Sequence, residues 1–267
     1  METKEPYPSI TGELIIQSMN LMGYDALNLG GSEFLFNREF LSGIRDLASF
    51  PLLSANIRWE KEGFLSQPFL IKEIAGIKLG IIGITSPFLV KKEGFLDIFL
   101  KTPEGVLPPL ISQLKKQKVD LIVVLSYLGF EGSSSLAKNV EGIDVIISAN
   151  HWKITRKPRK VGNTIIMQAT SKSKYLGVLT LTVDNKKRGI VNTRGRLVYL
   201  NDDVMKDQRI ARLVNQHTKK VAEAKKAQRR KEEIDQDKII KTLIKMSPEE
   251  YIESLKQAPP MPPSSKN

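Results

Sequence analysis

Two short apolar runs with no polar interruption set the architecture of this chain. They are Leu121-Ile-Val-Val-Leu and Val145-Ile-Ile. A strand that is apolar at every position is buried on both faces, as the central strands of a parallel sheet are. Both faces of the sheet must therefore be covered, and the chain is predicted to fold as a layered α/β domain.

Up to residue 200, similar runs alternate with amphipathic stretches. Strands are predicted at 25–29, 52–55, 69–73, 78–84, 120–126, 144–148, 164–169, 177–183 and 190–200. Helices are predicted at 12–22, 39–47, 108–117 and 133–139. The alternation in Leu179-Thr-Leu-Thr-Val and the turn signal Asp184-Asn-Lys-Lys-Arg-Gly indicate antiparallel hairpins. A mixed sheet, or two stacked sheets, is therefore expected in place of a purely doubly wound one.

The composition changes after Asn201, where a charged helical extension is predicted. One amphipathic stretch carries apolar residues at three- and four-residue steps, and a second one covers 239–244. A further helix is predicted to start at Ser247-Pro-Glu-Glu, because serine caps helices, proline fits the first turn and acids suit the positive helix end. The Pro-rich segment 258–267 is expected to be a tail or a linker to an appended domain.

Composition excludes several kinds of chemistry. The chain has no cysteine, which excludes disulfides, thiolate catalysis and cysteine-ligated metals, and its histidines are His151 and His217 alone. No run approaches the ~18 apolar residues of a spanning helix, so no membrane span is predicted. Forty-one Lys and Arg against twenty-nine Asp and Glu give a net charge of +12, which favours an anionic ligand or an acidic protein partner.

Five blocks in order carry a family resemblance. They are Met19-Asn-Leu-Met-Gly-Tyr-Asp-Ala-Leu-Asn-Leu-Gly-Gly-Ser-Glu-Phe, Phe50-Pro-Leu-Leu-Ser-Ala-Asn, Ile77-Lys-Leu-Gly-Ile-Ile-Gly-Ile-Thr, Val119-Asp-Leu-Ile-Val-Val-Leu-Ser-Tyr-Leu-Gly and Gly142-Ile-Asp-Val-Ile-Ile-Ser-Ala-Asn-His-Trp. Over roughly 12–200 the chain resembles the 5′-nucleotidase-type metallophosphoesterases of the calcineurin-like superfamily. The resemblance implies a layered αββα sandwich with mixed sheets at 1–200, followed by the helical extension 201–257 and the tail 258–267. The family's first metal boxes are missing, so the domain is expected to be N-terminally incomplete.

The resemblance also implies where two metal ions would bind, and there the chain departs from the family. The matching positions hold Gly31, Ser32, Tyr127, Asn150 and Trp152 in place of asparagine and histidine. If the fifth block is matched to the family with a shift of one residue, His151 takes one ligand position. The second ligand position then falls on Lys153, which is a cation. We therefore expect no metal cofactor and no catalytic residue, and we interpret the domain as a degenerate family member kept for binding or scaffolding.

Two alternatives remain open. One is an active phosphoric ester hydrolase with an atypical site, in which Glu33, Asn150 and His151 hold metal, a divalent pair being the family's cofactor. The other is binding of nucleic acid or an acidic partner through the basic loop and the tail. A Ser/His/acid triad from Ser32, His151 and Glu33 is disfavoured, because adjacent Ser and Glu cannot reach both sides of one imidazole.

A basic loop follows the run Val145-Ile-Ile. Its candidate anion-binding residues are Trp152, Lys153, Arg156, Lys157, Arg159 and Lys160. Nucleic acid is the less favoured anion, because acids at 232–237 directly follow the lysine-rich stretch 219–231 and balance it. No signal peptide is seen at Met1-Glu-Thr-Lys-Glu-Pro, although the resemblance implies a periplasmic or other extracytoplasmic location.

Overall fold

The computed structural model describes residues 7–59, 66–88, 95, 97–150, 154–169, 174–184, 186, 189–247 and 250. The chain forms two compact units, which are Thr11–Val214 and the combination of Met1–Ile10 with Asn215–Asn267. No helix among the described residues is long and apolar enough to cross a membrane.

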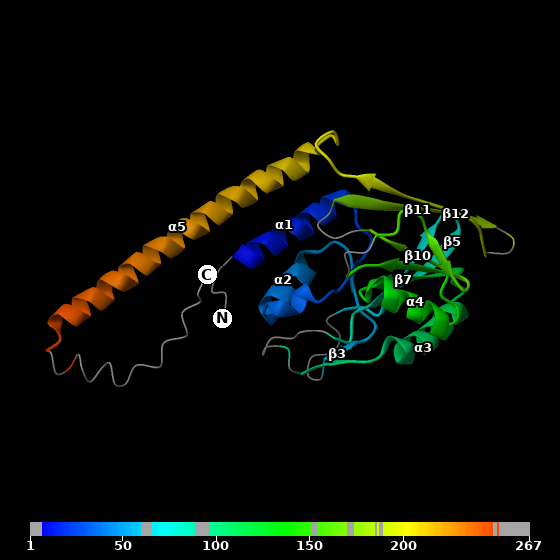
Figure 1. Cartoon of the computed structure of the whole chain (residues 1–267), viewed down its shortest axis with the longest axis horizontal. Coiled ribbons are helices and arrows are strands. Elements are labelled where there is room, and N and C mark those ends of the chain that lie inside the picture. The colour runs from blue at the N-terminus through cyan, green and yellow to red at the C-terminus, as the bar shows by residue number, and fades with distance from the viewer. Residues whose placement is uncertain are drawn as a thin grey trace. The chain divides into compact units, whose positions relative to one another are not determined.

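A six-stranded mixed sheet forms the centre of the first unit (Figure 1). Its order is β4 (Phe69–Ile74), β5 (Ile77–Ile84), β7 (Leu121–Ser126), β8 (Val145–Ser148), β10 (Thr164–Gln168) and β9 (Arg159–Val161). The four inner strands are parallel, and the two edge strands are antiparallel to their neighbours. The two apolar runs are the adjacent parallel strands β7 and β8, as their composition predicts.

Two helices cover one face of this sheet, α3 (Pro103–Lys116) and α4 (Gly129–Asn139). Alternate residues of the central strands, such as Val124 and Ile146, form a core with residues of both helices, among them Leu114 and Leu136. Both helices begin before their predicted starts. The helix predicted from residue 108 begins instead at Pro103, because Val106 and Leu107 of its first turns are buried.

Smaller sheets lie on the other face. They are the parallel pair of β1 (Leu27–Asn28) and β2 (Leu52–Leu53), the antiparallel pair of β3 (Ile57–Trp59) and β6 (Ile98–Leu100), and the hairpin of β11 (Tyr175–Asp184) and β12 (Gly189–Tyr199). Helices α1 (Tyr7–Met22) and α2 (Arg38–Leu47) pack against β1 and β2 in a second core that includes Phe34 and Phe95. The layers therefore run helix, sheet, sheet, helix, as predicted.

The second face of the central sheet is covered less completely than the apolar runs predict. Ile147 of β8, the last residue of its apolar run, has 38% of its surface exposed. The prediction that β8 is buried on both faces is therefore wrong for this position.

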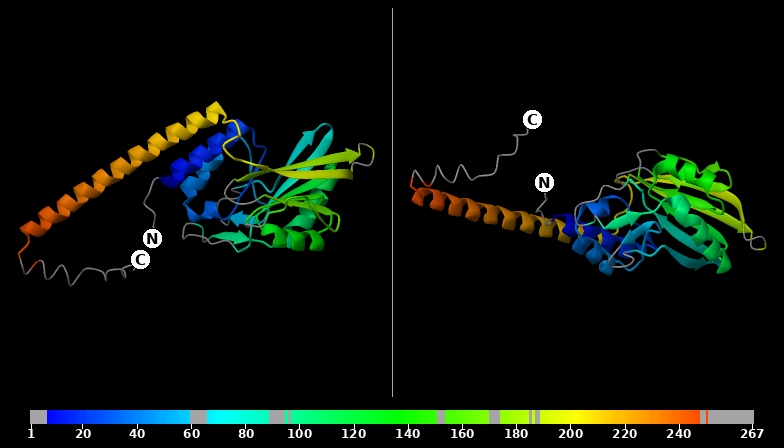
Figure 2. Two further views of the ribbon diagram at one scale, coloured as in Figure 1. Left: turned by 45° about the horizontal axis from the view of Figure 1, so that its top comes forward. Right: turned by 90° about the horizontal axis from the view of Figure 1, so that it is seen from below.

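The C-terminal extension contains one continuous helix, α5 (Gln208–Lys245), with no buried residue (Figure 2). The two separate amphipathic pieces predicted here are one helix, because no glycine or proline interrupts the sequence between them. The Ser247 N–H donates to the Glu250 carboxylate at 2.8 Å, and the Glu250 N–H donates to Ser247 Oγ at 3.3 Å. These two bonds support the helix start predicted at Ser247. Residues 251–257 and the tail 258–267 lie outside the described residues.

Candidate functional site

The candidate site lies where the parallel strands end at their carboxyl side. The Tyr127 N–H donates to Ile84 O, and the Ala149 N–H donates to Ser126 O, both at 2.8 Å. The Asn150 side-chain amide donates to Tyr127 O at 3.2 Å. The loops after β5, β7 and β8 are therefore joined, and they bring Tyr127 and Asn150 together.

The loop after β1 packs against the same tyrosine. A Cβ atom on Gly30 would lie 2.9 Å from Cε2 of Tyr127, so the ring rests directly on the glycine backbone. The Gly30 N–H donates to the Glu33 carboxylate at 3.0 Å. Gly31 is half-buried, and Ser32 is exposed at the start of the short helix η1 (Ser32–Leu35). The structure thus gathers Glu33, Tyr127 and Asn150, three of the residues singled out from the sequence.

Metal-ligating groups are scarce in these loops. Glu33 is the single carboxylate in segments 30–33, 127–129 and 149–150. Among the described residues, no group of three or more His, Asp or Glu side chains is placed to hold a metal ion. His151, Trp152 and Lys153 lie outside the described residues, so their predicted roles as ligand, stacking surface and anion contact stay predictions. The described residues alone do not fit a dinuclear metal centre.

A chain of buried hydroxyl groups lies beneath the loops. Ser126 Oγ and Ser133 Oγ are 2.9 Å apart, Ser133 Oγ donates to Ser148 Oγ at 3.0 Å, and Ser148 Oγ donates to Gln168 Oε1 at 2.7 Å. All four side chains are buried. They link the ends of β7, β8 and β10 to α4, and each hydroxyl is satisfied by another neutral group.

A second buried polar cluster fixes the β1 loop to the sheet. The Thr85 hydroxyl donates to Leu29 O at 2.7 Å, and it lies 2.9 Å from Ser54 Oγ. The Asn56 side chain donates to Thr85 O at 2.8 Å and accepts from the Thr85 N–H at 2.9 Å. Sequence reasoning missed both clusters. The sequence feature that could have predicted them is a small polar residue at the end of an apolar strand, as at Ser126 and Ser148.

The residues of the basic loop do not all lie in one place. Thr155 is buried and bonds to Gln168, whereas Arg156 and Lys157 are not buried. Lys157, Arg159 and Lys160 line a groove together with residues of β12. Arg156 is not among the residues that line it.

Sequence comparison connects the chain with phosphoesterases. No protein-family model matches. The rat 5′-nucleotidase is 30% identical over 234 residues, which cover 74% of this chain and 38% of the relative. The chain spans about two fifths of the length of the first curated relatives it matches.

Solved structures share the fold. A 5′-nucleotidase precursor from Thermus thermophilus superposes with a TM-score of 0.74 at 21% identity, covering 81% of this chain and 47% of that one. A calcineurin-like phosphoesterase from Bacillus subtilis has a TM-score of 0.68 at 24% identity, covering 80% of this chain and 76% of that one. At these identities the structural likeness establishes the architecture.

Proposed function

This chain belongs to the 5′-nucleotidase family of calcineurin-like metallophosphoesterases, and we propose that it is a catalytically degenerate member kept as a binding or scaffolding module. The observation that carries the proposal is the chemistry at the carboxyl ends of the strands. By the resemblance, Gly31, Tyr127 and Asn150 stand where the family has metal-binding asparagine and histidine, and Ser32 stands where it has a catalytic histidine. Glycine has no side chain to bind a metal ion, and the exposed Ser32 does not replace an imidazole.

Charge supports the proposal. Two divalent cations bring four positive charges, and the described loops offer the single negative charge of Glu33, which already accepts the Gly30 N–H. The buried groups beneath are neutral hydroxyls that bond to one another. Cations held next to a nearly neutral, desolvated region lose hydration without a compensating charge. A metal pair would therefore be unstable in this arrangement.

The space near the loops supports it as well. The ring of Tyr127 lies against Gly30, between the loop after β1 and the loop after β7. The resemblance places a ligand histidine at this position. An aromatic ring packed on the backbone fills volume that a metal and its water would need.

An active enzyme with an atypical site is the alternative, and one observation favours it. Glu33 and Asn150 both lie near Tyr127. Glu33 accepts the N–H of Gly30, which packs against the Tyr127 ring, and the Asn150 amide donates to the Tyr127 carbonyl. His151 follows directly in the sequence, and the three residues together offer two oxygen ligands and one nitrogen ligand. His151→Ala distinguishes the degenerate module from the active enzyme, because only the active enzyme depends on this imidazole.

Phosphatase assays test the proposal. The 267-residue chain is incubated with AMP or p-nitrophenyl phosphate and added Mn²⁺, with an active 5′-nucleotidase assayed in parallel. We expect no turnover above the protein-free blank. Mn²⁺-dependent turnover that a chelator and His151→Ala both abolish would establish the alternative.

We also propose an extracytoplasmic location, such as the periplasm. This proposal rests on the family resemblance. Fractionation of the source cells tests it, with a cytoplasmic enzyme as the marker. Recovery of the protein with that marker would contradict it.

A further inference from the structure

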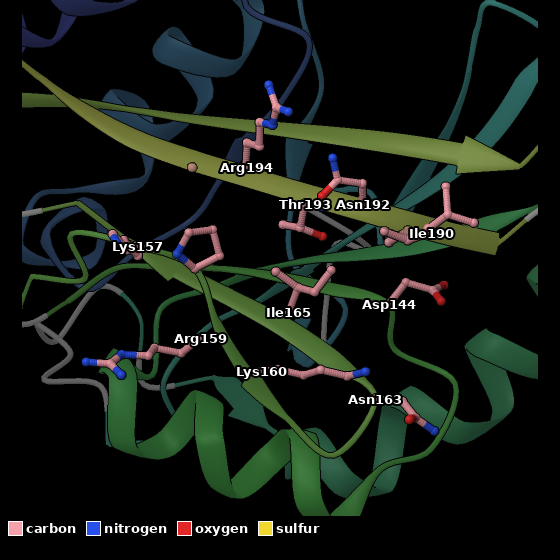
Figure 3. A pocket seen from close by; sticks show the side chains of 13 residues that line it. Asp144, Lys157, Arg159, Lys160, Asn163, Ile165, Ile190, Asn192, Thr193 and Arg194 are labelled. Atoms are coloured by element: carbon pink, nitrogen blue, oxygen red, sulfur yellow. Dashed lines mark hydrogen bonds between the residues drawn. The ribbon is translucent and has the colours of Figure 1, made fainter.

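A groove of about 720 Å³ lies between the edge of the six-stranded sheet and β12 (Figure 3). One wall comprises 157–160 with Ile165, and the other comprises 190–195 of β12. Asp144 lines one end. The groove is separate from the Tyr127 and Glu33 loops, neither of which lines it.

The groove exists because two layers touch at one end and part at the other. A Cβ atom on Gly195 would lie 2.5 Å from Cγ of Pro158 and 3.1 Å from Sδ of Met167, so the layers are in close contact there. Four residues earlier on β12, Val191 has 63% of its surface exposed. Ile165 of β10 also lines the groove but has only 8% of its surface exposed, so the accessible apolar surface lies on the β12 wall.

The edge of β12 is open on the groove side. Among the described strands, β12 pairs with β11 alone. Figure 3 shows β12 between β11 and β10, so its unpaired edge borders the groove. An unpaired strand edge presents backbone N–H and C=O groups at the spacing of an extended peptide.

The groove is flanked by cations that have no acidic partner in the described part of the chain. Lys157, Arg159, Lys160 and Arg194 all line it, and none forms an ion pair with another described residue. Figure 3 shows Arg194 directed away from Lys160 across β12. The charge of Arg194 therefore lies on the far side of β12 from Lys160, and the four charges do not converge on one point. A spread of this kind suits an extended polyanion better than a single phosphate group.

We propose that this groove binds an extended acidic peptide segment of a protein partner. The peptide backbone pairs with the open edge of β12. Alternate side chains then point to opposite faces, so apolar residues contact Val191 while carboxylates reach the flanking cations. The proposal does not depend on whether the domain hydrolyses phosphate esters.

Fluorescence anisotropy with a labelled octapeptide of alternating Glu and Val tests the proposal on the 267-residue chain. Combined Lys157→Glu, Arg159→Glu and Lys160→Glu should weaken binding at least about ten-fold. The matched control reverses two lysines and one arginine on the exposed surface of α5, Lys219→Glu, Lys226→Glu and Arg229→Glu. This control should leave the affinity within about two-fold of the original. Equal losses in both triple variants would overturn the proposal.

Two further probes identify the ligand class. A peptide of the same composition with four Glu followed by four Val should bind more weakly, because its carboxylates and apolar side chains no longer alternate. Inorganic triphosphate and an oligouridine should compete only at much higher concentration. Failure of the alternating peptide to bind, or displacement by either competitor at a lower concentration than unlabelled peptide, would contradict the proposal.

Discussion

The carboxyl ends of the parallel strands and the groove beside β12 use polar residues in opposite ways. At the strand ends, Ser126, Ser133 and Ser148 are buried and bond to one another. Along the groove, the cations have no acidic partner among the described residues. Buried polar groups that satisfy one another stabilise the fold, whereas unpaired charges on an open surface remain available to a ligand. Binding in this domain is therefore expected away from the place where its family carries out chemistry.

The close packing beneath the strand ends should be most sensitive at Gly83. A Cβ atom there would lie 2.7 Å from both the carbonyl carbon and Cβ of Leu53, which belong to a rigid neighbouring strand. We expect Gly83→Ala to lower the free energy of unfolding by about 3 kcal/mol in urea titrations. The control is Gly43→Ala in α2, where nothing lies within 4 Å, and it should stabilise by about 0.5–1 kcal/mol. Equal effects would mean that the layers are not in contact.

The hydroxyl chain should be the next most sensitive feature. Ser133→Ala removes the hydroxyl that connects Ser126 with Ser148 and leaves both without that partner. We expect a loss of about 1.5 kcal/mol in unfolding free energy. Ser134→Ala, one residue further along α4, removes only a half-buried bond to Phe130 O and should cost less than about 0.5 kcal/mol. A smaller effect at Ser133 than at Ser134 would contradict the assignment of the network.

Asp144 should make stability depend on pH. Burial raises the pKa of this carboxyl, although the Ile122 N–H and the positive charge of Lys115 oppose the shift. The folded state then holds the proton more tightly than the unfolded state, so stability falls as pH rises from 3.8 through the raised pKa. Asp144→Asn stays neutral and should gain stability relative to the original chain across that window. Denaturation curves at several pH values check this, and a constant difference would exclude it.

The same substitution also tests whether Asp144 repels an acidic peptide in the groove. Asp144 is the one acid among the described residues that line it. Asp144→Asn should therefore tighten binding of the alternating acidic peptide by about two- to five-fold at neutral pH. Unchanged binding would show that Asp144 lies too far from the peptide to matter, and weaker binding would contradict an acidic ligand in the groove.

The groove should tolerate substitution with the smallest effect on stability. The variant that combines Lys157→Glu, Arg159→Glu and Lys160→Glu changes side chains that have no acidic partner within the described ranges. We expect its unfolding free energy to stay within about 0.5 kcal/mol of the original value. A larger loss would mean that these cations support the fold, and the contrast with the strand ends would disappear.

Much of the architecture could be predicted from the sequence, because its signals are local. The runs at β7 and β8 identified the central parallel strands, and five blocks in order identified the family. Strands β3, β6 and β9 were missed, because three residues are too few to show a period. The early start of α3 was also missed, since burial of Val106 and Leu107 depends on the sheet beneath them.

The sites were harder to predict than the fold. The sequence singled out Glu33 and Asn150 as alternative metal ligands and Tyr127 as the residue in place of a ligand histidine, and the structure brings the three together. It offered no sign of the bond between Ser133 and Ser148, which joins a helix to a strand. Nor did it place Lys160 near Val191, because that requires β12 to lie over the edge of the other sheet.

Calorimetric titration with Mn²⁺ tests whether the carboxyl ends of the parallel strands hold metal. The chain is first freed of metal with a chelator and then titrated to about 1 mM Mn²⁺, a range that detects weak sites. We predict no saturable binding. One or two sites of micromolar affinity that are lost in Glu33→Gln or His151→Ala would contradict this prediction.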